Sequence, residues 1–148
     1  MAAITRSRTV PAEQQAVWDV LADFGELSSW VDRCDHSSIL NHGLESPAGT
    51  SRRVQMGRDV LVETITEFVA PITLAYDIDG LSARFGRLAN RWTLSTTGPD
   101  TVVSVTSTID CGRGARARAT ELVVGRVMAK TSDEMLAGLI RRMESRHD

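Results

Sequence analysis

The chain has only two cysteines among its 148 residues. Cys34 and Cys111 lie far apart, which argues against a zinc cluster and gives no reason to expect a disulfide, so we expect free, buried thiols. No stretch approaches the roughly 18 consecutive apolar residues of a membrane span. The first residues also lack the apolar core of a signal peptide. We therefore expect a cytoplasmic protein without integral membrane association.

A marked excess of one charge is also missing. The sequence has 17 basic and 19 acidic side chains, with a formal net charge of -2. This balance provides no general electrostatic attraction for nucleic acid, so we expect no nucleic-acid partner. The length fits a single domain over residues 1–148, which would bury about two thirds of its unfolded surface. Such a domain can enclose a ligand-sized cavity.

Helical periodicity occurs at the two ends of the chain. Residues 11–25 predict a short helix, because Val17, Val20, Leu21 and Phe24 share one face, and a second helical turn is expected near residues 27–31. Residues 119–146 predict a closing helix about 40 Å long. Its inner stripe is expected to contain Val124, Val127, Met128, Met135, Leu139 and Met143.

Every strong pattern between the helices has a period of two. We predict strands at residues 4–10, 37–42, 50–56, 60–69, 72–78, 87–97 and 101–110. A tight turn at residues 57–59 would join the third and fourth strands, and glycine or proline marks loops at residues 43–49 and 79–86. The predicted class is α+β, an antiparallel sheet covered by one long helix. Whether side chains fill the space between them decides the function.

Four stretches resemble a known family: Pro11 to Glu13 with Val17, Trp18 and residues 21–25; Trp30; residues 49–54; and residues 61–63 with residues 76–78. They are similar to the START-like, birch-pollen-allergen-like superfamily, also called SRPBCC, and within it to the bacterial polyketide cyclase/dehydrase group. The resemblance covers almost the whole chain. It implies a helix-grip fold, in which a curved seven-stranded sheet, with two short helices after its first strand, wraps the long C-terminal helix around a deep, mostly apolar cavity.

That superfamily includes lipid carriers, hormone receptors, allergens, cyclases and oxygenase subunits, so the fold alone does not select a function. The oxygenase branch holds iron with two histidines and a carboxylate. The three histidines here are His36, His42 and His147, one of them at the terminus, so we expect no metal and no other cofactor. The leading hypothesis is the binding, carriage or sensing of a small hydrophobic or lipid-like molecule by a monomer or homodimer.

Glu63 is the first candidate for a polar contact in such a cavity. It shares a strand face with Leu61 and Ile65, while threonines occupy the opposite face, so Glu63 should point inward. A buried carboxylate needs a partner, and Arg52 on the preceding strand can supply one inside the cavity. The alternative is an ion pair at the rim that touches no ligand; Arg52→Met would weaken ligand binding only in the first case. The resemblance also suggests ligand contact by Glu63 through water.

The other candidates line the predicted interior. Aromatic side chains with a polar atom suit a pocket that orients one oxygen of an apolar ligand, and methionine adapts to varied shapes. The more common role of such residues is ordinary core packing. The predicted ligand-binding set is Trp30, Arg52, Val54, Glu63, Tyr76, Trp92, Met128 and Met135. The mouth is expected between residues 43–49, residues 79–86 and the near end of the closing helix.

Two other classes of function stay open. A polyketide cyclase or dehydratase would need a folded substrate and groups that move protons, for which Glu63 and Tyr76 are the catalytic candidates. A carboxylate paired with Arg52 would be a weak base, which counts against catalysis. A module that binds only a partner protein would have a filled core and an exposed apolar patch. Cys34 and His36 are loop neighbours that need not face each other, so we predict no cysteine nucleophile.

Overall fold

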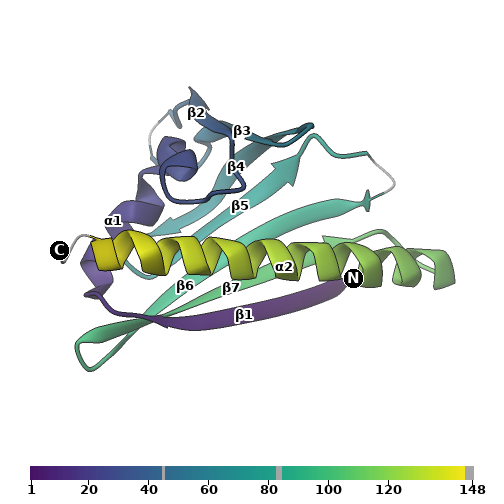
Figure 1. Ribbon diagram of the computed structural model, residues 1–148. Helices are drawn as coiled ribbons and strands as arrows, with labels where there is room; N and C mark the ends of the chain where they lie inside the picture. Colours follow the sequence, from purple (N-terminus) through teal and green to yellow (C-terminus); the bar gives the residue numbers. More distant parts are fainter. Residues whose placement is uncertain (45, 83–84, 146–148) are drawn as a thin grey trace.

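The computed structural model describes residues 1–44, 46–82 and 85–145 (Figure 1). Its strands are β1 (Ala2–Val10), β2 (His36–Asn41), β3 (Ser51–Met56), β4 (Asp59–Val69), β5 (Thr73–Asp79), β6 (Arg87–Thr97) and β7 (Asp100–Asp110). Two short helices, α1 (Gln14–Ala22) and the 3-10 helix η1 (Phe24–Ser29), follow β1, and α2 (Ala115–Ser145) closes the chain. Arg146 and His147, which the sequence-based predictions include, lie outside the described residues.

All seven strands form one antiparallel sheet in the order β1-β7-β6-β5-β4-β3-β2. The first strand therefore pairs with the last one, and the hairpins between β2 and β7 complete the sheet. Figure 1 shows α2 running along one face of this sheet, across β6, β7 and β1. The predicted helix-grip fold, with its seven curved strands, two short helices and long closing helix, is confirmed.

The β3–β4 hairpin sets the register of the candidate site. Gly57 has φ +62°, a left-handed conformation that glycine adopts without the steric cost of a side chain. The resulting two-residue turn pairs Met56 with Asp59 and, further along the strands, Arg52 with Glu63. Because directly opposed residues in an antiparallel pair lie on the same face, both side chains point to the side covered by α2.

The inner face of α2 differs from the predicted stripe. Met135, Leu139 and Met143 are buried as predicted, but Val127 is 57 % exposed, and the helix begins earlier, at Ala115. Before Met135 the helix instead buries small or polar residues, among them Glu121, Gly125, Ala129 and Ser132. Small side chains let the helix backbone lie close to β1 and β7, which it contacts. The larger side chains of this part of α2, such as Val127, therefore lie at the side of the helix and not beneath it.

The core is continuous from α1 through η1 to the middle of the sheet and the second half of α2. Its largest fully buried side chains include Trp92, Tyr76, Leu74, Leu136 and Leu139. None of the helices in the described part of the chain has the length and apolar character needed to cross a membrane. Beneath the last turns of α2, at Leu136, Leu139 and Met143, the interior is filled by side chains, and the space for a ligand lies nearer the middle of the helix.

Candidate functional site

A cavity of about 180 Å³ lies between the middle of α2 and the inward face of β3 to β6. Its inner end is formed by the buried residues Glu63, Asn90 and Met135. Most of its wall is aliphatic. The cavity is therefore closed at a polar end and apolar along its length.

The mouth of this cavity is formed by exposed residues, namely Asp59 at the β3–β4 turn, Leu81 after β5, and Val127 on α2. The prediction for residues 79–86 is partly confirmed, because Leu81 contributes; residues 83–84 lie outside the described residues. The prediction for residues 43–49 is wrong. Gly43, Ser46 and Pro47 line a separate hollow beside α1 and η1, because the loop folds back over the ends of those helices.

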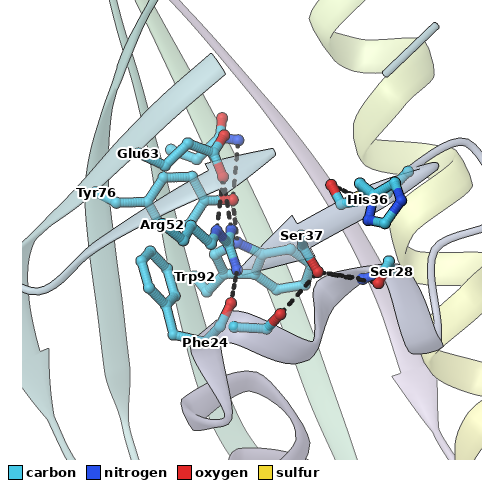
Figure 2. Close-up of polar contacts among 11 residues, drawn as sticks. Phe24, Ser28, His36, Ser37, Arg52, Glu63, Tyr76 and Trp92 are labelled. Carbon is cyan, nitrogen blue, oxygen red and sulfur yellow. Dashed lines mark hydrogen bonds and ion pairs between the residues drawn. The ribbon is translucent and has the colours of Figure 1, made fainter. Parts of the chain in front are cut away.

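Glu63 forms a buried ion pair with Arg52 (Figure 2). Arg52 Nε donates to Glu63 Oε1 over 2.8 Å, and Nη2 lies 2.7 Å from the same oxygen. The two residues are only 4 % and 3 % exposed. The inward direction predicted for both side chains is confirmed. Removing either partner would leave the other buried without a counter-charge.

The remaining surface of the Arg52 guanidinium is also occupied. Nη1 donates to the Phe24 carbonyl oxygen over 2.9 Å, which ties β3 to η1. The guanidinium carbon lies 3.7 Å from the centre of the Phe24 ring and 4.9 Å from that of Tyr76. Ser37 Oγ in turn donates to the Gly25 carbonyl oxygen over 2.7 Å and holds η1 against β2. Arg52 therefore packs behind the cavity and does not line it.

A row of buried polar side chains crosses the sheet next to this ion pair. The Tyr76 hydroxyl oxygen accepts hydrogen bonds from Trp92 Nε1 (3.2 Å) and Asn90 Nδ2 (3.3 Å). Asn90 Oδ1 accepts from Ser107 Oγ at 2.6 Å, and Ser107 Oγ lies 3.5 Å from Ser132 Oγ on α2. Tyr76, Asn90 and Ser107 occupy paired positions on β5, β6 and β7. The row links the sheet to the long helix.

The predicted ligand-binding residues fall into two groups. Glu63, Met128 and Met135 line the cavity. The others do not line it: Arg52, Val54, Tyr76 and Trp92 are enclosed in the core, and Trp30 packs edge-on against Trp92 with ring centres 6.1 Å apart. Aromatic rings that could have surrounded a ligand instead pack on one another and on Arg52.

The two cysteines were predicted to be free, buried thiols without a nucleophilic role. Both cysteines are free; Cys34 is buried and Cys111 is half-buried. Cys34 Sγ donates to the His36 carbonyl oxygen over 3.2 Å, and burial raises the pKa of the Cys34 thiol. A thiol with a raised pKa is a poor nucleophile. Among the described residues, no three His, Cys, Asp or Glu side chains lie close enough together to hold a metal ion.

The family described as polyketide cyclase/dehydrase and lipid transport matches residues 1–144. The chain belongs to this family. The predicted resemblance is thereby confirmed over nearly its whole length. A search of the curated proteins finds no match.

Solved structures show the same fold as this family member. A START superfamily protein from Mycobacterium smegmatis aligns with a TM-score of 0.78 at 14 % identity, covering 97 % of each chain. The Zhui aromatase/cyclase from Streptomyces sp. R1128 aligns with a TM-score of 0.75 at 17 % identity, covering 99 % of this chain and 96 % of that one. Ara h 8.0201 gives 0.75 at 13 % identity over 97 % and 98 %. At these identities the likeness establishes the fold and leaves the ligand undetermined.

Among the residues that line the cavity, Asn90 is a buried polar side chain that the sequence analysis missed. It occupies an inward position on β6, flanked by Leu88 and Trp92 on the same face. An amide at a core position of an otherwise apolar face is a signal in itself, because a buried polar group needs partners. Its partners lie on β5 and β7, so only the register of three strands makes its place at the cavity evident.

Alkaline titration should show how tightly Tyr76 is enclosed. Burial raises the pKa of the Tyr76 hydroxyl, and the nearby Glu63 carboxylate adds to the effect. The unfolded chain, with an ordinary tyrosine pKa of about 10, then loses the proton first. The ionisation of Tyr76 therefore leaves the free energy of unfolding unchanged below about pH 10 and lowers it as the pH rises above that value.

Tyr76 is the only tyrosine, so phenolate absorbance near 295 nm reports on it alone. We expect no phenolate absorbance while the near-ultraviolet circular dichroism spectrum remains native. The phenolate should appear only when the native spectrum is lost. A titration midpoint near pH 10 in protein with an intact native spectrum would contradict the enclosure of Tyr76.

Proposed function

We propose that this protein binds a small, mostly apolar molecule in the cavity between α2 and β3 to β6, with Glu63 at its polar end. The observation that carries the proposal is a cavity with apolar walls and a mouth at Asp59, Leu81 and Val127, closed by the buried Glu63 and Asn90. Binding sites for small molecules commonly combine apolar walls with a few fixed polar groups. In this proposal Met128 and Met135 contact the apolar part of the ligand, and Arg52 positions Glu63.

The size of the cavity supports a ligand of about one ring. A volume of about 180 Å³ is close to the roughly 150 Å³ of a cavity that binds benzene, and lies below the roughly 300–1,000 Å³ of sites for drug-sized ligands. A long-chain lipid would keep most of its chain outside the mouth. We therefore narrow the expected lipid-like class to compact molecules, with any chain extending past Leu81 and Val127.

A cyclase or dehydratase is the second candidate, favoured by the family description and by the aromatase/cyclase fold neighbour. Of the two predicted catalytic residues, only Glu63 lines the cavity. Tyr76 lies behind Asn90 and accepts two hydrogen bonds there. Proton transfer would then depend on one carboxylate that Arg52 already contacts. We rank binding first because it requires no second proton-transferring group. Turnover of a ring-closing substrate that Glu63→Gln abolishes would reverse this order.

The same proposal covers partners and location. With a net charge of -2, a small molecule is a better partner than nucleic acid. We propose that the protein works in the cytoplasm as a monomer or homodimer.

Thermal stability in the presence of toluene tests the binding proposal. A ligand that binds only the folded state at about 100 times its dissociation constant stabilises by about 2.7 kcal/mol, and each kcal/mol raises Tm by roughly 2–4 °C for a chain of this size. Met128→Trp should fill the cavity and abolish the shift. Leu122→Trp is the matched control, because Leu122 lies on the same helix but is exposed and does not line the cavity.

A toluene-dependent rise in Tm for the native protein and Leu122→Trp, but not for Met128→Trp, would support the proposal. Equal shifts in all three proteins would place toluene elsewhere. Absence of any shift, with no bound toluene detected by NMR in the native protein, would refute binding in this cavity.

A further inference from the structure

We propose that the inner end of the cavity selects an uncharged hydroxyl group, held between Glu63 and Asn90, and rejects a carboxylate. This inference rests on the proposed binding function and names the chemical class of the ligand. The polar end would thus recognise an alcohol or a phenol.

The first step concerns the free oxygen of Glu63. Both contacts from Arg52 go to Oε1. No group among the described residues donates a hydrogen bond to Oε2, although Glu63 lines the cavity. A carboxylate oxygen accepts hydrogen bonds and does not donate them. The ligand group that meets Glu63 must therefore be a donor.

The second step concerns Asn90, which supplies the opposite function. Its amide nitrogen carries two hydrogens, of which the Tyr76 hydroxyl takes one. Its amide oxygen accepts a hydrogen bond from Ser107 Oγ at 2.6 Å. The second N–H is left for the cavity. Glu63 on β4 lies opposite Ile78 of β5, which lines the cavity. Asn90 on β6 lies opposite Tyr76, two residues along β5. In this proposal a ligand hydroxyl over this part of β5 donates to Glu63 and accepts from Asn90.

The third step concerns charge. The Arg52 cation cannot meet a ligand carboxylate, because its guanidinium is occupied by Glu63 Oε1, the Phe24 carbonyl and two aromatic rings. Arg33, which does line the cavity, lies towards solvent and pairs with Glu134 over 3.3 Å. Asp59 at the mouth adds negative charge. A ligand carboxylate at Glu63 Oε2 would therefore bring two hydrogen-bond acceptors together with no hydrogen between them.

A ligand cation is also disfavoured, because the charge of Glu63 is already balanced by Arg52 and the cation would still lose its hydration. A hydrocarbon of the same shape fits the walls but leaves Oε2 and the Asn90 N–H without partners, which costs affinity. Among ligands of equal size, the expected order of affinity is alcohol, then hydrocarbon, with carboxylate and ammonium weakest.

Isothermal titration calorimetry with four ligands that share one ring and one carbon substituent tests this order. The ligands are benzyl alcohol, toluene, benzoate and benzylamine, measured at neutral pH. We expect benzyl alcohol to bind at least tenfold more tightly than toluene, and benzoate and benzylamine to bind more weakly than toluene.

Asn90→Leu keeps the Arg52–Glu63 pair intact while removing the donor. It should reduce the ratio of benzyl alcohol to toluene affinity at least fivefold without weakening toluene binding. Thr131→Val is the matched control, because Thr131 lines the same cavity but its hydroxyl is already engaged. It donates to the Val127 carbonyl of its own helix and accepts from Arg33 Nη1. The affinity ratio should be unchanged in this variant.

The outcomes separate this inference from the function on which it rests. Equal affinities for benzyl alcohol and toluene, or tightest binding of benzoate or benzylamine, would overturn the hydroxyl preference and leave the binding function intact. A preference that survives in Asn90→Leu, measured on protein with a native circular dichroism spectrum, would remove Asn90 from the site. If none of the four ligands binds, the proposed function fails and this inference fails with it.

Discussion

Arg52→Met should lower the free energy of unfolding by about 3–5 kcal/mol, because it leaves the Glu63 carboxylate buried without its partner. It also frees the Phe24 carbonyl oxygen and removes the guanidinium from between two rings. Small proteins are stable by only about 5–15 kcal/mol, so the loss is a large share of the total. Urea denaturation followed by circular dichroism measures it as a lower midpoint.

The matched control is Arg91→Met. Arg91 pairs with Glu67 over 3.1 Å on the same sheet, but those side chains are 54 % and 41 % exposed. Exposed ion pairs contribute about 0–1 kcal/mol, so this variant should remain close to native stability. The double variant Arg52→Met/Glu63→Leu should recover much of the loss, because it removes the isolated charge. Equal costs for Arg52→Met and Arg91→Met would contradict the structural role assigned to the buried pair.

The inward direction of this pair could be predicted from the sequence, since two elementary patterns determine it. Alternation along residues 60–69 assigns Glu63 to the face of Leu61 and Ile65, all of which are buried. The short turn at Gly57 then fixes which residue of β3 lies opposite. Both patterns are local, so neither requires knowledge of the packing between the sheet and α2.

The face of α2 could not be predicted in the same way. Counting large apolar residues placed Val127 inside, whereas Gly125 and Ala129 occupy the positions that meet the sheet. Close helix-sheet packing is favoured by small residues there, and hydrophobicity does not distinguish a small residue on a solvent face from one at a tight contact. A buried Glu121 was missed for a similar reason, because its partners, the Cys111 N–H and the amino terminus, come from the far end of β7 and from β1.

The volume of the cavity depends on still longer-range packing. Phe24, Trp30 and Trp92 come from η1, the loop after it, and β6, and they fill space that an apolar ligand could have taken. Whether a ring faces a cavity or another ring is set by the distance between α2 and the sheet. The residue types alone are compatible with either arrangement, so the sequence could nominate aromatic candidates but could not determine which of them reach the ligand.

Gly138 lets α2 approach the backbone of Trp30, just after η1, and Gly138→Ala should be strongly destabilising. A β-carbon at this position would lie 2.2 Å from the Trp30 carbonyl oxygen and 3.3 Å from the carbonyl carbon. These are backbone atoms, which cannot turn aside as a side chain can. Alanine normally favours a helix by about 1 kcal/mol over glycine. Overpacking typically costs about 1–3 kcal/mol, and we expect the upper end of that range because α2 must move away from Trp30 as a whole.

Gly125→Ala provides a control in the same helix. Its new β-carbon would meet only Ile109 Cδ1 at 3.7 Å, an ordinary van der Waals distance. The helical preference of alanine should then raise the free energy of unfolding by up to about 1 kcal/mol. Opposite signs for the two substitutions in urea denaturation would show that α2 meets Trp30 backbone to backbone. If both alanine substitutions raise the free energy of unfolding, the backbone of α2 does not meet Trp30 closely at Gly138, and the cavity beside Met135 has room to widen.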